Sequence, residues 1–165
     1  TDADLTEADL SGAVLTHAIL TDAILTDAIL TDANLSGAIG LPDPSQWLRE
    51  CFAADDRGII VYRAMNGTHS QPESWVWEPG AILTENAHSD RCSPCAYGVS
   101  FATPQWLLAN TGLASPPYWR CHIAWMDLAG VVVPYNTDGK ARCTRLELIE
   151  EVSAEELKTL RREGA

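Results

Sequence analysis

The chain has 165 residues and is strongly acidic, with 23 Asp and Glu side chains against 11 Lys and Arg. This charge repels nucleic acid and anionic lipid, so it argues against direct binding to either one. No apolar run approaches the roughly 18 residues that a membrane-spanning helix needs, and no signal-peptide pattern is visible. We therefore expect a cytoplasmic protein that contacts neither nucleic acid nor membrane directly.

A five-residue repeat fills the start of the chain. Ala recurs at every fifth position from Ala3 to Ala38, and Leu follows two places later from Leu5 to Leu35. Neither a helix nor a plain strand would place every Leu on one face, whereas a coil that turns a corner at each repeat would. Polar pairs such as Thr-Asp then occupy the corners. The repeat predicts stacked coils that share one continuous core.

This five-residue repeat resembles the repeats of the pentapeptide-repeat family. The resemblance implies a right-handed, quadrilateral β-helix with about four repeats per coil over residues 1–40. Thr1 and Asp2 form the tail of a repeat, and no Met precedes them, which predicts a fragment with further coils upstream. Such a short stack buries little surface, so we expect the next domain to cap its lower end.

The acidic residues concentrate in this repeat segment. Residues 1–40 contain no Lys or Arg, and the expected corners carry Asp22, Asp27 and Asp32. A coil of about 20 residues would place like charges in columns, with Glu7 beneath Asp27. Two interpretations follow: a solvated scaffold surface, or a mimic of duplex DNA that acts on a DNA-binding protein, as some pentapeptide-repeat proteins do. We favour the scaffold, because mimicry needs a long rod.

Residues 41–165 are long enough for a second domain with its own core. Asp43-Pro44 and Thr103-Pro104 are typical helix starts, and Ser153 to Glu156 is a capping box. The pattern predicts an α+β domain around an antiparallel or mixed sheet. The expected elements are helices over 44–54 and 103–110, strands over 58–63, 99–102, 118–126, 130–134 and 141–150, a hairpin turn over 136–139, and a terminal helix after residue 153.

The cysteines allow a metal site. Cys92 and Cys95 have the two-residue gap of a zinc knuckle, and a tetrahedral site could be completed by Cys121, Cys143, His88 or His122. Cys121 and Cys143 fall on expected strands, however, where ordinary buried thiols would also lie. The odd total of five cysteines argues against a disulfide framework. We expect no cofactor, with zinc as the alternative.

Three motifs in the second domain loosely resemble those of ADP-ribosyltransferases: Val61-Tyr62-Arg63, the strand around Ser100, and Arg145-Leu146-Glu147. The resemblance implies that Arg63 and Ser100 hold NAD and that Glu147 stabilises the cation formed at the ribose. That chemistry requires the three side chains to converge. The alternative is that they are ordinary strand residues on the solvent-exposed face of a sheet.

A second resemblance covers more of this domain. Its motifs include Trp77-Glu-Pro-Gly80, Cys95-Ala-Tyr-Gly-Val-Ser-Phe-Ala102 and Asp127-Leu-Ala-Gly-Val131. They resemble a small uncharacterised domain of phage and bacterial proteins that often lies beside pentapeptide repeats. Members often carry His where this chain has Ser100. The resemblance implies an origin but no activity.

These observations favour a non-catalytic protein-binding or scaffold protein. We expect the second domain to cap the repeat stack and to present a surface to a protein partner. The expected contacts are the acidic corners Asp22, Asp27 and Asp32 together with the aromatic loop residues Trp75 and Trp77, because large aromatic side chains are common anchors in interfaces. A transferase and a DNA mimic are the two alternatives.

Overall fold

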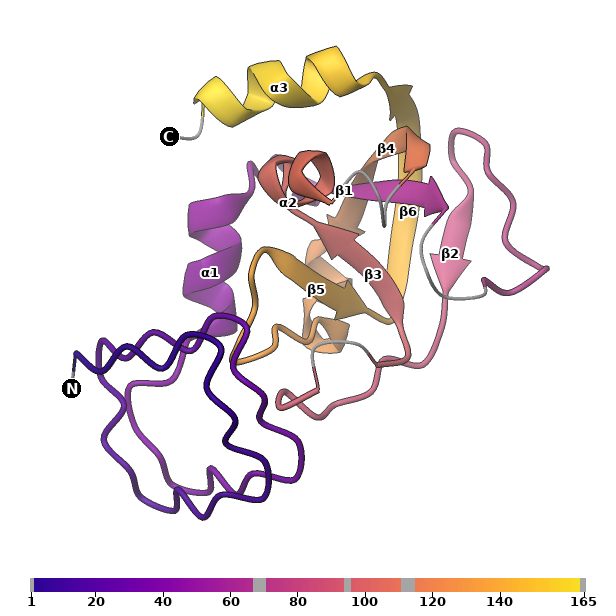
Figure 1. Cartoon of the computed structure of the whole chain (residues 1–165). Helices are drawn as coiled ribbons and strands as arrows, with labels where there is room; N and C mark the ends of the chain where they lie inside the picture. Colours follow the sequence, from indigo (N-terminus) through magenta and orange to yellow (C-terminus); the bar gives the residue numbers. More distant parts are fainter. Residues whose placement is uncertain (1, 67–70, 94–95, 111–114, 164–165) are drawn as a thin grey trace.

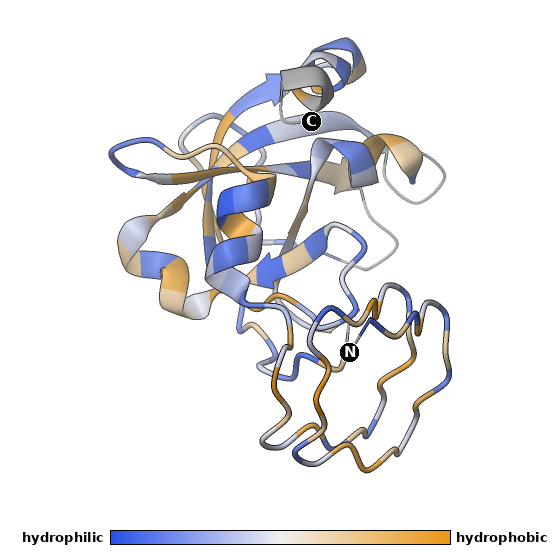
Figure 2. Cartoon of the chain, turned by 90° about the vertical axis from the view of Figure 1, so that its left-hand side faces the viewer, coloured by the Kyte–Doolittle hydropathy of each residue, from blue (hydrophilic) through white to orange (hydrophobic). Residues whose placement is uncertain are grey.

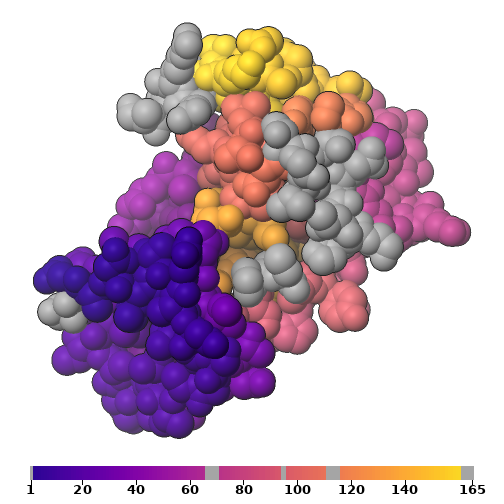
Figure 3. All heavy atoms as spheres, viewed as in Figure 1, coloured from indigo at the N-terminus to yellow at the C-terminus, as the bar shows by residue number. Residues whose placement is uncertain are grey.

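The computed structural model describes residues 2–66, 71–93, 96–110 and 115–163 (Figure 1). The N-terminal segment is a coil that outlines a four-sided ring, and a mixed domain of strands and helices follows it. In the space-filling view the coil forms a lobe beside the mixed domain (Figure 3).

The coil rises by one layer every 20 residues. Parallel bridges join Asp4 to Ile24, Asp9 to Ile29, Val14 to Asn34, and Ile19 to Ile39. Main-chain hydrogen bonds run between the layers; for example, the Leu5 amide donates to the Ile24 carbonyl at 2.9 Å. Four repeats therefore complete one turn, as the resemblance predicted, and residues 2–40 form two stacked turns.

Each corner of the coil has its second residue in the left-handed region, with φ between 55° and 71°. Glycine adopts this conformation without steric cost, and Asp tolerates it better than most residues. The composition of the corners follows this requirement. The residues concerned are Asp2, Glu7, Gly12, His17, Asp22, Asp27, Asp32 and Gly37.

The mixed domain contains a six-stranded antiparallel sheet that curves into a half-barrel. Its strand order is β2-β6-β4-β1-β3-β5. This architecture is compatible with the expected α+β domain. The strands are β1 (Gly58–Asn66), β2 (Ile82–Thr84), β3 (Val99–Ala102), β4 (Ser115–Ala124), β5 (Lys140–Cys143) and β6 (Arg145–Val152).

Three α-helices begin where their capping residues predict. In α1 (Pro44–Cys51) Asp43 accepts a hydrogen bond from the Gln46 amide, and in α2 (Pro104–Ala109) Thr103 accepts one from the Trp106 amide. The third helix, α3 (Ala154–Glu163), starts with the predicted capping box between Ser153 and Glu156. The longest of these helices has 10 residues, and no helix in the described ranges is long and apolar enough to cross a membrane.

Three strand predictions differ from the structure, and the first is the strand expected over 118–126, which ends at Ala124. Residues 125–130 form a 3-10 helix, η1 (Trp125–Gly130), and the expected strand over 130–134 is reduced to a single bridge from Val132 to Arg142. The expected strand over 141–150 is divided at Thr144 into β5 and β6, which pair with different neighbours. Gly130 explains the break, because its carbonyl accepts the Thr144 amide and a Cβ there would lie 2.1 Å from the Thr144 hydroxyl oxygen.

One continuous core fills the mixed domain. Leu48 of α1, Leu107 of α2 and Leu157 of α3 all belong to the same buried cluster as the sheet. Phe52, which follows α1, packs edge-on against Phe101 of β3 with ring centroids 5.7 Å apart. The helices therefore complete the hydrophobic interior that the sheet begins.

The mixed domain also closes the second turn of the coil. The Asn136 amide donates to the Ala28 carbonyl at 2.6 Å, and the Cys92 thiol lies 3.8 Å from the Ala33 carbonyl. Cys92 is buried in the same cluster as the inward leucines of the coil. Arg91 stabilises this junction, because its guanidinium donates hydrogen bonds to the carbonyls of Val133 and Pro42.

Candidate functional site

The outward side chains of the coil are mostly aliphatic. In each repeat Ala and Leu point inward, so the residue between them faces solvent. Five of these residues are 48–75% exposed even with the mixed domain in place: Val14, Ile19, Ile24, Ile29 and Ile39. Figure 2 shows hydrophobic residues along the sides of the coil and hydrophilic residues at its corners. The repeat contains this signal, because the residue after Ala is usually aliphatic from Val14 onward; the predicted partner surface was instead placed at the acidic corners.

One side of the coil carries only aliphatic outward residues. The bridge between Ile19 and Ile39 stacks these two side chains, and Val14 and Ile24 lie around the adjacent corners. We call these four residues, which span three consecutive sides of the coil with the Ile19–Ile39 pair at the centre, the aliphatic surface. Asp4 and Asp9 hold the outward positions on the two remaining sides of the first turn, and each accepts hydrogen bonds from the residue two places later, Thr6 or Ser11.

The acidic corners border this surface. Asp22, Asp27 and Asp32 are exposed at three corners of the second turn. Partial burial raises the pKa of Asp27 above its ordinary value, and repulsion from Asp138 and Glu7 adds to the shift. The interaction with Glu7 agrees with the predicted column of like charges. Apolar sides with carboxylate corners are the main surface feature of the coil.

The aromatic loop does not present its rings freely. Trp75 and Trp77 are half-buried and pack edge-on, and Trp77 lies 6.3 Å from the ring of Trp119 in β4. The Trp75 indole donates to the Thr84 carbonyl. Val76, between the two rings, is the exposed residue. The expected role of these tryptophans as partner anchors is therefore not supported by their orientation.

Arg63 and Ser100 lie together, as the transferase resemblance requires. Arg63 is only 6% exposed, and its Nη1 donates to the carbonyl and, at 2.8 Å, to the hydroxyl of Ser100. Its guanidinium lies over the rings of Trp75 and Trp77, at 4.9 and 5.6 Å from the centroids. Desolvation lowers the pKa of Arg63.

Glu147 lies elsewhere. It pairs with His122 in β4, which pairs with Ile60 in β1, three residues before Arg63. Because successive strand residues alternate in direction, Glu147 and Arg63 point to opposite faces of the sheet. Glu147 instead forms an ion pair with Arg57 at 2.6 Å. The three residues of the transferase motif do not converge.

The candidate zinc ligands are divided between two cores, with Cys92 in one and Cys121 and Cys143 in the other. Cys121 and Cys143 are fully buried in the sheet core, and burial raises the pKa of Cys143 to about 12. Cys92 belongs to the core of the coil instead, and Cys95 lies outside the described residues. Within the described ranges no three His, Cys, Asp or Glu side chains form a group that could hold a metal ion. The zinc site remains a prediction.

The two candidate histidine ligands have other partners. His122 is buried, and its Nε2 lies 3.1 Å from an Asp55 carboxylate oxygen. His88 Nδ1 accepts a long hydrogen bond of 3.4 Å from the Asp90 amide. These contacts give both histidines a structural explanation.

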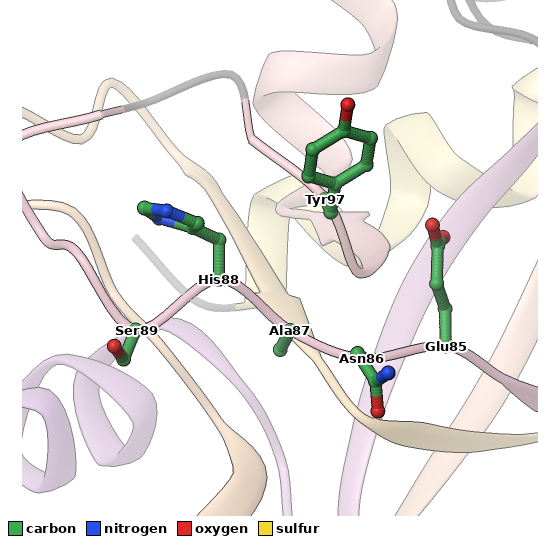
Figure 4. A pocket seen from close by; sticks show the side chains of 6 residues that line it. All are labelled: Glu85, Asn86, Ala87, His88, Ser89 and Tyr97. Carbon is green, nitrogen blue, oxygen red and sulfur yellow. The ribbon is translucent and has the colours of Figure 1, made fainter.

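A groove of about 530 Å³ lies beside β3, and the sequence did not reveal it. It is lined by Glu85, Asn86, Ala87, His88, Ser89 and Tyr97. The His88 amide donates to the Tyr97 carbonyl, and Arg142 donates to the carbonyls of His88, Asp90 and Ser93. Figure 4 shows the side chains of Glu85, His88 and Tyr97 on the same side of the loop. The groove depends on these long-range bonds, which leave no local sequence signal.

Comparison with known proteins identifies only the coil. A family model described as pentapeptide repeats matches residues 1–39 in 8 copies. No curated protein and no solved structure matches the chain. The resemblance of the mixed domain to a phage and bacterial domain is therefore without independent support. Residues 1–39 are a pentapeptide-repeat segment, and a repeat protein without catalytic function is the role that such a segment suggests.

Proposed function

We propose that this chain is a non-catalytic binding protein whose β-helix docks a protein partner. The observation that carries the proposal is the aliphatic surface, formed by Val14, Ile19, Ile24 and Ile39, on a segment that has no Lys or Arg. Clustered apolar side chains with a polar border are typical of protein interaction sites. The mixed domain holds the coil from one end and leaves these sides free.

The charge of the coil defines the partner's chemistry. The carboxylates of Asp22 and Asp27 stand at corners beside apolar sides, so a complementary partner carries aliphatic side chains flanked by Lys or Arg. A second copy of this chain is a poor match, because two molecules of net charge -12 would bring acidic corners together.

The same surface argues against DNA mimicry as the main role. A mimic needs carboxylates along its outward sides, where phosphates would be. Here the sides carry Ile19, Ile24, Ile29 and Ile39, and the acidic groups stand mainly at the corners. The transferase alternative retains the contact of Arg63 with Ser100 but lacks a converging Glu147.

The test compares capture of proteins from the native host by the full chain and by a surface variant. In the variant, Ile19→Thr and Ile39→Thr remove the stacked pair and keep β-branched side chains at both positions. Val76→Thr, at a residue of similar exposure in the mixed domain, is the matched control. We expect a partner that the wild type and control bind and the surface variant loses. The partner's affinity for the purified chain should also fall with rising salt. Equal binding to all three proteins would contradict the proposal.

A further inference from the structure

The groove beside β3 is lined mainly by an extended segment of main chain. Five of its six lining residues form the continuous run 85–89, which follows β2 directly. Exposed and half-buried side chains alternate from residue 84 to residue 88, as they do along a strand. Within the described ranges, the main-chain amides and carbonyls of Asn86, Ala87 and Ser89 form no hydrogen bond with another main-chain group. An extended segment of this kind can pair with the main chain of a second extended segment.

Contacts with the rest of the mixed domain fix this segment in place. The Glu85 amide donates to the Thr144 carbonyl, and the His88 amide donates to the Tyr97 carbonyl. The His88 carbonyl accepts a hydrogen bond from the guanidinium of Arg142. Because the segment is already ordered by these bonds, a ligand loses less free energy to the ordering of its binding site.

The side chains in the groove are suited to a cationic group. The Tyr97 side chain is 74% exposed, and it lies on the same side of the segment as Glu85 and His88 (Figure 4). The Glu85 carboxylate takes part in none of the ion pairs of the described ranges, although it interacts electrostatically with the buried Arg63. The sequence contains no Lys or Arg between Arg63 and Arg91. A carboxylate beside an exposed aromatic ring is complementary to a Lys or Arg side chain, whose aliphatic stem can lie on the ring.

We propose that the groove binds an extended peptide segment of a partner protein, which pairs with the main chain at Asn86 and Ala87 and directs a Lys or Arg side chain to Glu85 and Tyr97. In this mode of recognition, main-chain hydrogen bonds provide affinity and the side-chain contacts provide specificity. The volume of about 530 Å³ lies within the usual range for ligand sites. The site belongs to the mixed domain and is independent of the aliphatic surface of the coil.

The competing explanation is general attraction of any basic peptide to a chain of net charge -12. Such attraction requires no main-chain pairing, and it acts at acidic residues throughout the molecule. Peptides that differ only in charge or only in their main-chain donors therefore separate the two explanations.

The experiment is a titration of the isotope-labelled full chain with synthetic pentapeptides, followed by amide chemical shifts at constant salt concentration. The first peptide is Thr-Lys-Val-Lys-Thr with acetylated and amidated ends. A second peptide has Glu in place of both Lys residues, and a third keeps the Lys side chains but is N-methylated at every residue. We expect saturable shifts at the amides of Asn86, Ala87 and Ser89 with the first peptide. Each of the other two should bind about tenfold more weakly.

Variants of the chain test the side-chain contacts. Glu85→Gln should weaken binding of the Lys peptide about threefold and reduce its preference over the Glu peptide. Tyr97→Ala should also weaken binding, and it changes an exposed side chain. Glu151→Gln is the matched control, because it makes the same chemical change at an exposed residue of β6, opposite Trp119 and beyond the part of β6 that pairs with β2. We expect this control to bind as the wild type does.

Three outcomes would overturn the proposal: no saturable response at the groove, equal binding of the N-methylated peptide, or equal effects of the two Glu→Gln variants. Shifts confined to the acidic corners of the coil would count as the first of these. The chain with Ile19→Thr and Ile39→Thr should bind the Lys peptide as the wild type does. Failure of this site and failure of docking by the coil are therefore distinguishable.

Discussion

At the scale of single residues, the corners of the coil show how backbone conformation selects side chains. The second residue of each corner has a positive φ, yet six of these eight residues are not glycine. His17 and Gly37 occupy equivalent corners in successive turns, and a Cβ at residue 37 would lie 2.4 Å from the His17 ring. The small residue in the second turn leaves room for the large one in the first.

This relation makes Gly37→Ala a test of corner packing. The left-handed conformation costs an L-residue about 1 kcal/mol, and displacement of the exposed His17 ring adds a smaller cost. We expect the free energy of unfolding to fall by about 1–2 kcal/mol in a urea titration. His17→Ala in the same chain removes the ring but keeps a Cβ in the left-handed conformation at residue 17, so it should recover only the steric part. If Gly37→Ala were as stable as the wild type, the chain would not require the left-handed conformation at residue 37.

The pH dependence of Asp27 follows from its raised pKa. A carboxyl whose pKa is higher in the folded than in the unfolded chain destabilises the fold when it is ionised, and the penalty disappears as the pH falls below both values. Asp27→Asn should therefore raise the melting temperature at pH 7, by the equivalent of a few tenths of a kcal/mol, and the gain should vanish near pH 3. Asp22→Asn is the control at another acidic corner. A constant gain across this range would show that ionisation of Asp27 is not its cause.

At the scale of elements, local signals were sufficient for the helices and insufficient for two strands. Asp43, Thr103 and Ser153 predicted their helices because capping involves residues only three positions apart. The break at Thr144 depends on its contact with Gly130, and the short strand β2 depends on pairing with β6. Contacts between distant residues leave no periodic pattern in either partner.

Ser153→Ala tests the cap of α3. The hydroxyl accepts the Glu156 amide and donates to its carboxylate. The hydrogen bond from the Ser153 backbone amide, and to a smaller extent the bond from the hydroxyl, keep the pKa of Glu156 below its ordinary value. Loss of such a cap costs about 1 kcal/mol, so we expect a lower melting temperature at pH 7. Ser153→Thr, which retains the hydroxyl, should keep most of the stability. The difference between the Ala and Thr variants should shrink as acid protonates Glu156, because its stabilising contribution is present above its unfolded pKa and lost below its folded one.

The candidate site was predictable only in part. The motif resemblance required Arg63 and Ser100 to meet, and the two side chains are in contact; each lies on a strand that the sequence predicts. It placed Glu147 wrongly, because strand register decides which face a residue occupies and the sequence does not fix register across the sheet. Cys92 was expected in a metal knuckle and instead fills the end of the coil.

At the scale of the whole molecule, the junction couples the coil to the mixed domain. Asn136 and Cys92 extend from the mixed domain into hydrogen-bonding contact with the second turn. All six tryptophans lie outside the coil, so their fluorescence reports only the mixed domain, whereas far-UV circular dichroism reports both parts. The two signals can therefore show whether the parts unfold together.

Asn136→Ala tests this coupling. The substitution leaves the Ala28 carbonyl without its 2.6 Å donor, and we expect a loss of about 1–2 kcal/mol. The fluorescence and dichroism transitions should shift together to lower denaturant concentration. Thr137→Ala, beside the junction, is a control for general disturbance of this turn. A shift in dichroism alone would show that the coil unfolds independently.

Because each turn of the coil contains 20 residues, the coil can change in length only by complete turns. Insertion of one residue would turn every later side chain out of line with its neighbour, whereas insertion of a complete turn would restore the alignment. The described junction contacts involve Ala28 and Ala33 of the second turn, so a turn added before them would leave the mixed domain in place. The aliphatic surface of the coil can therefore grow in whole layers while the contacts with the mixed domain stay unaltered.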